Sequence, residues 1–292
     1  MKQKMLMPLL VLLLTTGSLQ EIAKAEVTFG DAVNAEDGDA QAQLKLGLMH
    51  YNGELGWPQD FKQAFVWFSK AAEQGNADAQ AYLGMMYAYG QGVAQDAKQA
   101  VAWYRKAAEQ GQGGAQALLG EKYAYGQGVP QDYAQAAVWY SKAAEQGQAY
   151  AQYSLGVMYA EGQGVAQDFK KAAAWYSKAA EQGQVDAQNK LGLLLFEGKN
   201  VPQDYQKAVF WFRKGAEQGN TVAQAMLGLT YFLGNGVPQN YQQAYAWLAI
   251  AVANGNDGAL NLRDTVASKL TQSELTQAQS LAASYFEQYQ SK

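Results

Sequence analysis

The stretch from Gly75 to Gln110, GNADAQAYLGMMYAYGQGVAQDAKQAVAWYRKAAEQ, is the unit from which most of this 292-residue chain is built. Its tryptophan recurs every 36 residues, at Trp67, Trp103, Trp139, Trp175, Trp211 and Trp247. A fixed period of about 20 to 50 residues is typical of solenoids and other repeat arrays. The sequence therefore predicts one elongated array in which each repeat buries its apolar face against its neighbours.

Two helices within each repeat follow from the spacing of apolar residues. The first, helix A, is expected from Asp78 to Ala88, because one face carries the apolar stripe Ala79, Leu83, Met86 and Tyr87. Gly90 should end it, because glycine adopts the left-handed conformation of a helix C-terminus. Asp96 then predicts the N-cap of helix B, whose expected buried stripe is Ala100, Trp103, Tyr104, Ala107 and Ala108.

The repeats occupy residues 38–254, between a lead-in at 26–37 and expected C-terminal capping helices at 255–292. The first repeat has one extra turn residue, in a segment that contains Trp57, the one tryptophan outside the period. In the fifth repeat Asn200 replaces a turn glycine, which predicts a left-handed residue there. The polar side of the sixth helix B becomes apolar at Ile250, so we expect the tail to cover it, with Thr271 to Glu274 as a capping box.

Residues 1–25 have the pattern of a secretory signal peptide. Lys2 and Lys4 precede an apolar run from Met5 to Leu14, and Ala23-Lys24-Ala25 predicts cleavage before Glu26. A membrane anchor is the alternative, but about ten apolar residues are too few for a span that needs about 20. The chain has no cysteine. We therefore expect a bacterial protein of the periplasm or one that is secreted, with no integral membrane span and no disulfide.

The charge balance argues against a nucleic-acid partner. Without residues 1–25, which hold Lys2, Lys4, Lys24 and Glu21, the chain has 19 basic and 25 acidic side chains and a net charge of −6. Nucleic-acid binding depends on basic residues that neutralise phosphates, and no basic run is present. We expect a monomer with protein or peptide partners.

These residues resemble the Sel-one-like (Sel1-like) repeat family, a relative of the tetratricopeptide repeat. The pattern AxxGxxDAQxxLGxxYxxGxGVxQDxxxAxxWYxKAAxQG covers about 220 residues. The resemblance implies an all-α fold, a right-handed α/α superhelical solenoid of about six helix-turn-helix repeats with a C-terminal helical cap. It also implies a scaffold that holds other proteins, in the bacterial envelope or in contact with a host, and it supplies no catalytic residues. Some exported members carry a disulfide in each repeat, which this chain cannot form.

Motifs of catalysis, metal binding and cofactor binding have structural explanations in this chain. His50 is the only histidine and takes the place of Tyr87 in the next repeat, so we interpret it as a core or rim residue. Without cysteine or further histidine, few donors for a transition metal exist, so no metal and no cofactor is expected. The repeated Gly-x-Gly turns follow helices and predict C-caps, not phosphate loops. The repeated aspartates, such as Asp96, are explained by helix capping.

The face of helix A opposite its apolar stripe is the predicted binding surface. In the second repeat it contains Asp78, Ala81, Met85, Ala88 and Tyr89, and in the tetratricopeptide arrangement the equivalent positions line the concave groove. Its side chains vary between repeats and several are large and aromatic, as in a binding surface. The expected partner-binding residues are Leu48, Tyr51, Met85, Tyr89, Glu121, Tyr125, Tyr150, Tyr153, Val157, Glu161, Asn189, Phe196, Glu197 and Phe232.

The leading hypothesis is an exported, non-enzymatic scaffold that binds a protein or peptide in this groove. Ordinary surface variation is the simpler interpretation of the same residues. One alternative function is an envelope enzyme acting on cell wall or a β-lactam through the carboxylates of Glu121, Glu161 and Glu197. Another is a structural spacer without a groove ligand.

Overall fold

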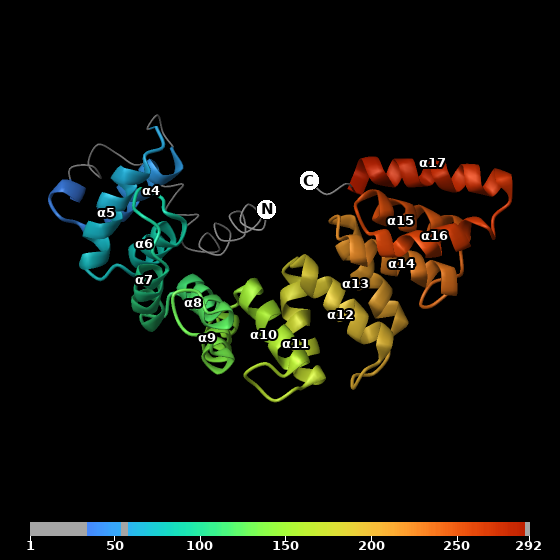
Figure 1. Ribbon diagram of the computed structural model, residues 1–292, viewed down its shortest axis with the longest axis horizontal. Coiled ribbons are helices and arrows are strands. Elements are labelled where there is room, and N and C mark those ends of the chain that lie inside the picture. Colours follow the sequence, from blue (N-terminus) through green and yellow to red (C-terminus); the bar gives the residue numbers. More distant parts are fainter. Residues whose placement is uncertain (1–33, 54–57, 290–292) are drawn as a thin grey trace. The chain divides into compact units, whose positions relative to one another are not determined.

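A computed structural model describes residues 34–53 and 58–289 of the chain, and in these ranges all regular structure is helical (Figure 1). Twelve helices of 13 residues each form six pairs: α4 (Ala40–Asn52), α5 (Phe61–Glu73), α6 (Ala77–Tyr89), α7 (Ala97–Glu109), α8 (Gly113–Tyr125), α9 (Tyr133–Glu145), α10 (Ala149–Glu161), α11 (Phe169–Glu181), α12 (Val185–Glu197), α13 (Tyr205–Glu217), α14 (Thr221–Leu233) and α15 (Tyr241–Ala253). A 3₁₀ turn, η1 (Asp257–Ala259), and two helices follow, α16 (Leu260–Ala267) and α17 (Gln272–Tyr289). The predicted all-α solenoid of helix pairs is confirmed. The signal segment and Trp57 lie outside the described residues.

The helices belong to two compact units. Of the described residues, the first unit comprises 34–53, 58–158 and 162–166, and the second comprises 159–161 and 167–289. Within each unit, consecutive helices pack against one another, from α4 to α9 in the first unit and from α11 to α15 in the second, so that α5, for example, contacts both α4 and α6. This pattern of nearest-neighbour contacts defines a solenoid.

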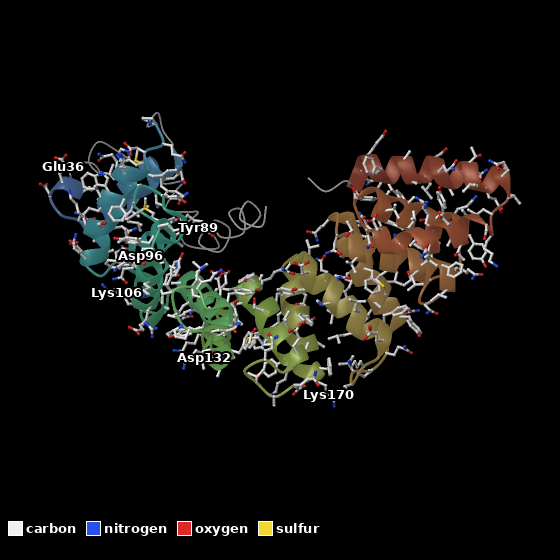
Figure 2. The ribbon with its side chains drawn as sticks, in the orientation of Figure 1. Glu36, Tyr89, Asp96, Lys106, Asp132 and Lys170 are labelled. Atoms are coloured by element: carbon white, nitrogen blue, oxygen red, sulfur yellow. The ribbon has the colours of Figure 1, made fainter. Side chains whose placement is uncertain are left out.

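The helix boundaries follow from the expected caps. Asp96 is the N-cap of α7, and its carboxylate accepts hydrogen bonds from the backbone N–H groups of Lys98 (2.9 Å) and Gln99 (3.1 Å) (Figure 2). Gly90 ends α6 in the left-handed conformation, with φ of 70°. Asn200 is the one residue other than glycine with positive φ among the described residues, at 56°. These local predictions are confirmed.

In α7 the fully buried ring belongs to the residue that follows the tryptophan. Tyr104 is fully buried in α7, while Trp103 is half-buried and Lys106 lies over its ring at 3.9 Å from the centroid. The same Trp–Lys contact recurs at Trp67–Lys70, Trp139–Lys142 and Trp175–Lys178. The expectation that Trp103 belongs to the buried stripe is therefore wrong. Adjacent helix positions differ by about 100°, and the pattern alone did not show which of the two rings faces the core.

Helix A is buried on more than one side. In α6 the expected stripe residues Ala79, Leu83 and Met86 are buried, but Tyr87 is half-buried, and Ala81 and Met85 from the opposite side are buried too. The helices α6, α8, α12 and α14 each pack between two helices B, so a single apolar stripe describes them poorly. A Cβ at Gly84 would lie 2.5 Å from the ring of Tyr104, so glycine permits this close approach. Gly84 therefore lets α6 and α7 pack closely.

A buried glutamine in each helix A connects successive helix pairs. The side chain of Gln80, 5% exposed, donates 3.1 Å to the carbonyl oxygen of Ala72 at the end of α5. Equivalent bonds to the preceding helix B are made by Gln116, Gln152, Gln188 and Gln224. Each of these glutamines thereby ties the start of its repeat to the end of the one before.

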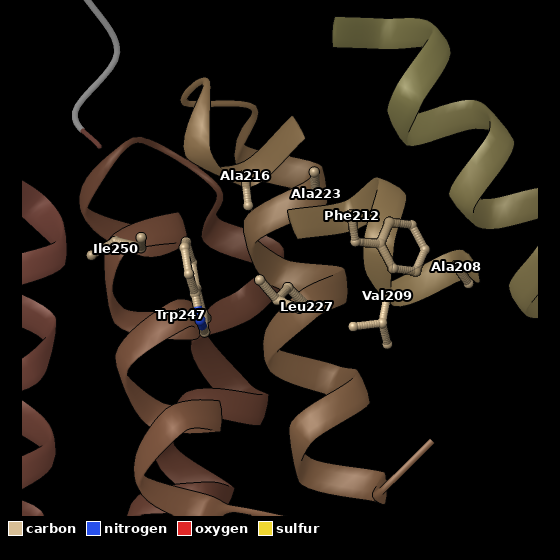
Figure 3. Packing of buried hydrophobic residues seen from close by; sticks show 8 residues of the cluster. All are labelled: Ala208, Val209, Phe212, Ala216, Ala223, Leu227, Trp247 and Ile250. Atoms are coloured by element: carbon tan, nitrogen blue, oxygen red, sulfur yellow. The ribbon is translucent and has the colours of Figure 1, made fainter. Parts of the chain in front are cut away.

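The tail covers the sixth repeat, as expected, because α16 and α17 pack against α15, whose buried cluster is shown in Figure 3. Trp247 and Ile250 of α15 are buried with Leu227 of α14 and Phe212 of α13 in one apolar cluster. Tyr285 of α17 lies over Trp247, with ring centroids 4.7 Å apart. Thr271 and Glu274 form the predicted capping box, since the Thr271 N–H donates to the Glu274 carboxylate (2.8 Å) and the Glu274 N–H donates to the Thr271 hydroxyl (3.3 Å).

Candidate functional site

The fourteen predicted binding residues differ widely in exposure. Only three are exposed: Tyr125, Glu161 and Glu197. Six are half-buried: Tyr89, Tyr150, Tyr153, Val157, Phe196 and Phe232. The other five, expected on an open face, are buried: Leu48, Tyr51, Met85, Glu121 and Asn189. They are buried because helix A packs against more neighbours than a single apolar stripe provides for, so nine of the fourteen reach solvent.

The helix-A face of the first unit is rich in tyrosine. Tyr51 of α4 donates a hydrogen bond of 2.9 Å to Gln91, and its ring lies 5.8 Å from the ring of Tyr82 in α6. Tyr89 lies half-buried at the end of α6, and Tyr125 ends α8 with 66% of its surface exposed. We call the side chains of Tyr89, Glu121, Tyr125 and Tyr150 the first-unit face.

A buried ion pair lies within this face. Glu121 and Lys122 of α8 are 5% and 8% exposed, and the Lys122 Nζ lies 3.1 Å from the Glu121 Oε1. The Lys122 Nζ also donates to the Gln127 Oε1 (2.8 Å), and the Tyr150 hydroxyl of α10 donates to the Glu121 Oε2 (3.2 Å). The equivalent residues of the second repeat are Met85 and Met86, which are buried and apolar. The third repeat therefore has a buried charged pair at the two positions that the second repeat fills with buried methionines.

The charge of Glu121 acts on two buried tyrosines of the helix-B layer, Tyr104 and Tyr140. Burial raises the pKa of Tyr104, which ordinarily is near 10, and the nearby Tyr89 and Glu121 raise it further. Burial also raises the pKa of Tyr140, again with Glu121 close by, although hydrogen bonds with Tyr150 and Ser154 oppose that shift. The Tyr104 hydroxyl has no hydrogen-bond partner among the described residues. An unpaired buried hydroxyl is costly, because water has been removed from it without replacement.

The helix-A face of the second unit combines acidic and aromatic residues. Glu161 and Glu197 are the exposed last residues of α10 and α12. Phe196 packs edge-on against Tyr205 of α13 at 5.2 Å, and Phe232 lies 5.8 Å from Tyr241 of α15. Asn189 of α12 is 7% exposed, and its Oδ1 has no hydrogen-bond partner among the described residues. This face can offer carboxylates and aromatic edges to a partner.

Three features of the site were not found from the sequence. The Glu121–Lys122 pair could have been found, because it replaces Met85 and Met86 in an otherwise apolar position. The orphan hydroxyl of Tyr104 carries no sequence signal, because Tyr140 occupies the equivalent position with partners. The Trp–Lys contacts do have a sequence signal, because a lysine follows the repeat tryptophan by three residues in each of the first five repeats.

The described residues contain neither a cluster of metal-binding side chains nor a membrane-spanning helix. Within 34–53 and 58–289, no three or more His, Cys, Asp or Glu side chains come together as a metal site. The same residues include no helix with the length and hydropathy needed to cross a bilayer. His50 is 8% exposed at the end of α4, beside Asp60, and burial lowers its pKa from the usual 6.5.

Comparisons with known proteins give a consistent family. The Sel1 repeat model matches six segments: residues 40–76, 77–112, 114–148, 149–184, 185–220 and 221–256. A crystal structure of a Sel1 repeat protein from Oxalobacter formigenes is 35% identical, with a TM-score of 0.64, and the match covers 73% of this chain and 85% of that one. A protective antigen of uropathogenic Escherichia coli with an SLR fold is 30% identical over 89% of this chain and 86% of that chain, with a TM-score of 0.40.

One curated relative extends the comparison to eukaryotes. The Arabidopsis thaliana ERAD-associated E3 ubiquitin-protein ligase component HRD3A is 40% identical over 58 residues, which are 20% of this chain. The match covers 9% of that protein's length. The similarity is therefore one of repeats and not of whole proteins.

Proposed function

The chain belongs to the Sel1 repeat family, and from this premise we propose that it binds a protein or peptide partner through the helix-A faces of its units. Sel1 repeat proteins generally mediate protein–protein interaction and are typically non-enzymatic, which supports a scaffold role. The observation that carries the proposal is the tyrosine-rich first-unit face, in which Tyr125 is 66% exposed and Tyr89 and Tyr150 are half-buried. Exposed tyrosines are common anchors of interfaces, because each buries a large area and can still hydrogen-bond.

The spacer alternative predicts that this face is unused, and the enzyme alternative requires cooperating carboxylates. Glu121 is already bound by Lys122 and Tyr150, whereas Glu161 and Glu197 are exposed at helix ends. The partners of Glu121 are thus an ammonium and a phenol, whereas acid–base or glycosidase chemistry needs two cooperating carboxyl groups. We therefore favour the scaffold.

A selection of peptides from a random displayed library against residues 26–292 tests the proposal. We expect enriched peptides whose affinity falls about tenfold or more for the Tyr89→Ala/Tyr125→Ala variant. The matched control is Val66→Ala/Val138→Ala, which alters exposed side chains of helices B in the same unit. If the peptides bind the tyrosine variant with unchanged affinity, or lose as much affinity for the control variant, the helix-A face is not the binding surface.

We also propose that the chain is exported to the periplasm or the medium. The support is the pattern of residues 1–25, with its basic start, short apolar run and Ala-x-Ala site. Intact-mass measurement of protein from these compartments should give a chain that starts at Glu26. A full-length product retained in the cytoplasm would contradict the proposal.

A further inference from the structure

Helix α17 packs on α15 and contacts the tryptophan of the sixth repeat. The ring centroids of Tyr285 and Tyr289 lie 4.7 and 5.5 Å from that of Trp247. The Tyr285 hydroxyl donates a hydrogen bond of 2.9 Å to the side chain of Gln243, which precedes Trp247 by about one helical turn. A tyrosine of the docked helix therefore uses both a glutamine and a tryptophan of helix B.

The first unit repeats this combination of glutamine and tryptophan in all three of its helices B. The pairs are Gln63 and Trp67 in α5, Gln99 and Trp103 in α7, and Gln135 and Trp139 in α9. Side chains four residues apart lie on one face of a helix, so these helices present the pair as α15 does. In the second unit, α11 and α13 keep the tryptophan but have Lys171 and Lys207 in place of the glutamine.

The pair reaches solvent in α5 and α7. The side chains of Gln63 and Gln99 are exposed, and those of Trp67 and Trp103 are half-buried. By contrast, Trp247 beneath α17 is 1% exposed. The face that α17 covers on α15 is therefore open on these two helices.

Charge distinguishes the open face from the covered one. Where α15 has Ile250, α5 and α7 have the exposed Lys70 and Lys106, whose Nζ atoms lie 4.2 and 3.9 Å from the centroids of the neighbouring tryptophan rings. Helix α17 has no basic residue and two acidic ones, Glu274 and Glu287. A lysine side chain is flexible, so it can leave the ring for a carboxylate when another ring takes its place. An acidic helix is thus complementary in charge to α5 and α7.

We propose that α5 and α7 each bind a partner helix in the way that α15 binds α17. The occupant is an acidic amphipathic helix with two tyrosines four residues apart. One of its tyrosine rings packs on Trp67 or Trp103 and donates its hydroxyl proton to the glutamine of the same helix B, while a carboxylate pairs with the lysine. This surface belongs to helices B and the proposed function uses helices A, so each can fail without the other.

The probe is a synthetic peptide of residues 271–289, held helical by a hydrocarbon link between positions 276 and 280, which are exposed in α17. It is titrated into residues 26–292 labelled with 5-fluorotryptophan, and fluorine NMR signals are assigned with tryptophan-to-phenylalanine variants. We expect the signals of Trp67 and Trp103 to shift, and that of Trp211, on a helix B without the glutamine, to stay. No shift, an equal shift at Trp211, or a shift at Trp247 alone, where the peptide replaces α17, would overturn the proposal.

A double-mutant cycle tests the hydrogen bond. The peptide with Tyr285→Phe should bind the native chain about threefold to fivefold more weakly. Gln63→Met/Gln99→Met should weaken the native peptide by the same factor and leave the phenylalanine peptide unaffected, because the hydroxyl and the glutamine are partners. If the two losses add in full, the tyrosine does not contact the glutamine and this docking mode is refuted.

Charge reversal tests the lysines. Lys70→Glu/Lys106→Glu should weaken binding of the peptide about fivefold at about 0.15 M salt. The matched control is Lys178→Glu/Lys214→Glu, the same change at the equivalent positions of α11 and α13, with an expected loss below about twofold. All four lysines are exposed, so the variants should fold. Equal losses in the two variants would show general attraction between opposite charges and would refute the site.

Discussion

The side-chain amide of Gln110, the C-cap of α7, donates a hydrogen bond of 2.7 Å to the buried side-chain oxygen of Gln80 in α6. Gln80 in turn donates to the carbonyl oxygen of Ala72, so one amide connects the ends of α5 and α7. Gln146 and Gln218 repeat the relationship with Gln116 and Gln188. The recurring Ala-Gln and Glu-Gln-Gly motifs are therefore two halves of one contact between repeats.

Replacing Gln80 with methionine, which has a similar shape, should destabilise the first unit by about 1–3 kcal/mol. Two hydrogen bonds are lost, each with a net value of about 1 kcal/mol. The control is Gln99→Met, at an exposed position of α7, with an expected change within about 0.5 kcal/mol. Urea unfolding of both variants measures the difference, and equal stabilities would show that the glutamine contact contributes nothing.

Close approach of helices A and B gives a second prediction. Gly84→Ala places a methyl group 2.5 Å from the Tyr104 ring, so we expect a loss of about 1–3 kcal/mol through overpacking. Gly113→Ala, at the start of α8, meets only the flexible ends of Gln146 and Gln148 at 3.1 Å or more. That change should be neutral or stabilise by up to about 1 kcal/mol, since alanine favours helix. Thermal melts of the two alanine variants should therefore shift in different directions.

The period, the helix boundaries and the caps could be predicted because each depends on local sequence. Asp96 and Gly90 act on backbone groups within a few residues of themselves. The burial of Tyr104 rather than Trp103, and of Met85 on the supposed open side of α6, depends on how neighbouring helices pack. Those contacts come from other helices, such as Gly84 of α6 against Tyr104 and Tyr51 of α4 against Met85, and the spacing within one helix does not encode them.

The candidate site shows the same limit. The variation of side chains between repeats correctly predicted that Tyr89 and Tyr125 reach solvent. It also predicted this for Leu48 and Asn189, which are buried. The partner contacts of the nine residues that reach solvent remain a prediction.

The buried pair of Glu121 and Lys122 gives a third prediction, on stability alone. Glu121→Met should cost about 3–5 kcal/mol, because it leaves the Lys122 ammonium buried without its counter-charge. Glu121→Met/Lys122→Met recreates the residues of the second repeat and should be neutral or more stable than the native chain. A double-mutant cycle by urea unfolding measures the coupling. A double variant as unstable as the single one would mean that the pair stabilises the unit beyond its own charges.

Alkaline titration gives a fourth prediction. Burial, with the negative charge of Glu121 as a smaller cause, raises the pKa of Tyr89 to about 12 from a usual 10.0. Because the folded-state pKa lies above the unfolded one, the contribution of Tyr89 to stability is complete below pH 10 and is lost as the pH rises towards 12. NMR of the tyrosine ring carbons should show a midpoint near 12 that disappears in Tyr89→Phe. Its midpoint should fall in Glu121→Gln, and circular dichroism at each pH checks that the chain is still folded.

The last prediction separates a core aromatic from a surface aromatic within the first unit. Trp139 of α9 is 7% exposed, so Trp139→Ala should leave a cavity and cost about 3–5 kcal/mol. Tyr125 is 66% exposed, so Tyr125→Ala should change stability by no more than about 0.5 kcal/mol. The same tyrosine variant should weaken binding of a selected peptide by about 1–2 kcal/mol, as loss of an aromatic anchor does. Calorimetric melts and titrations of both variants test the two halves. A stable Tyr125→Ala protein with full affinity would remove this tyrosine from the interface, whereas an unstable one would show that its ring supports α8 and not a partner.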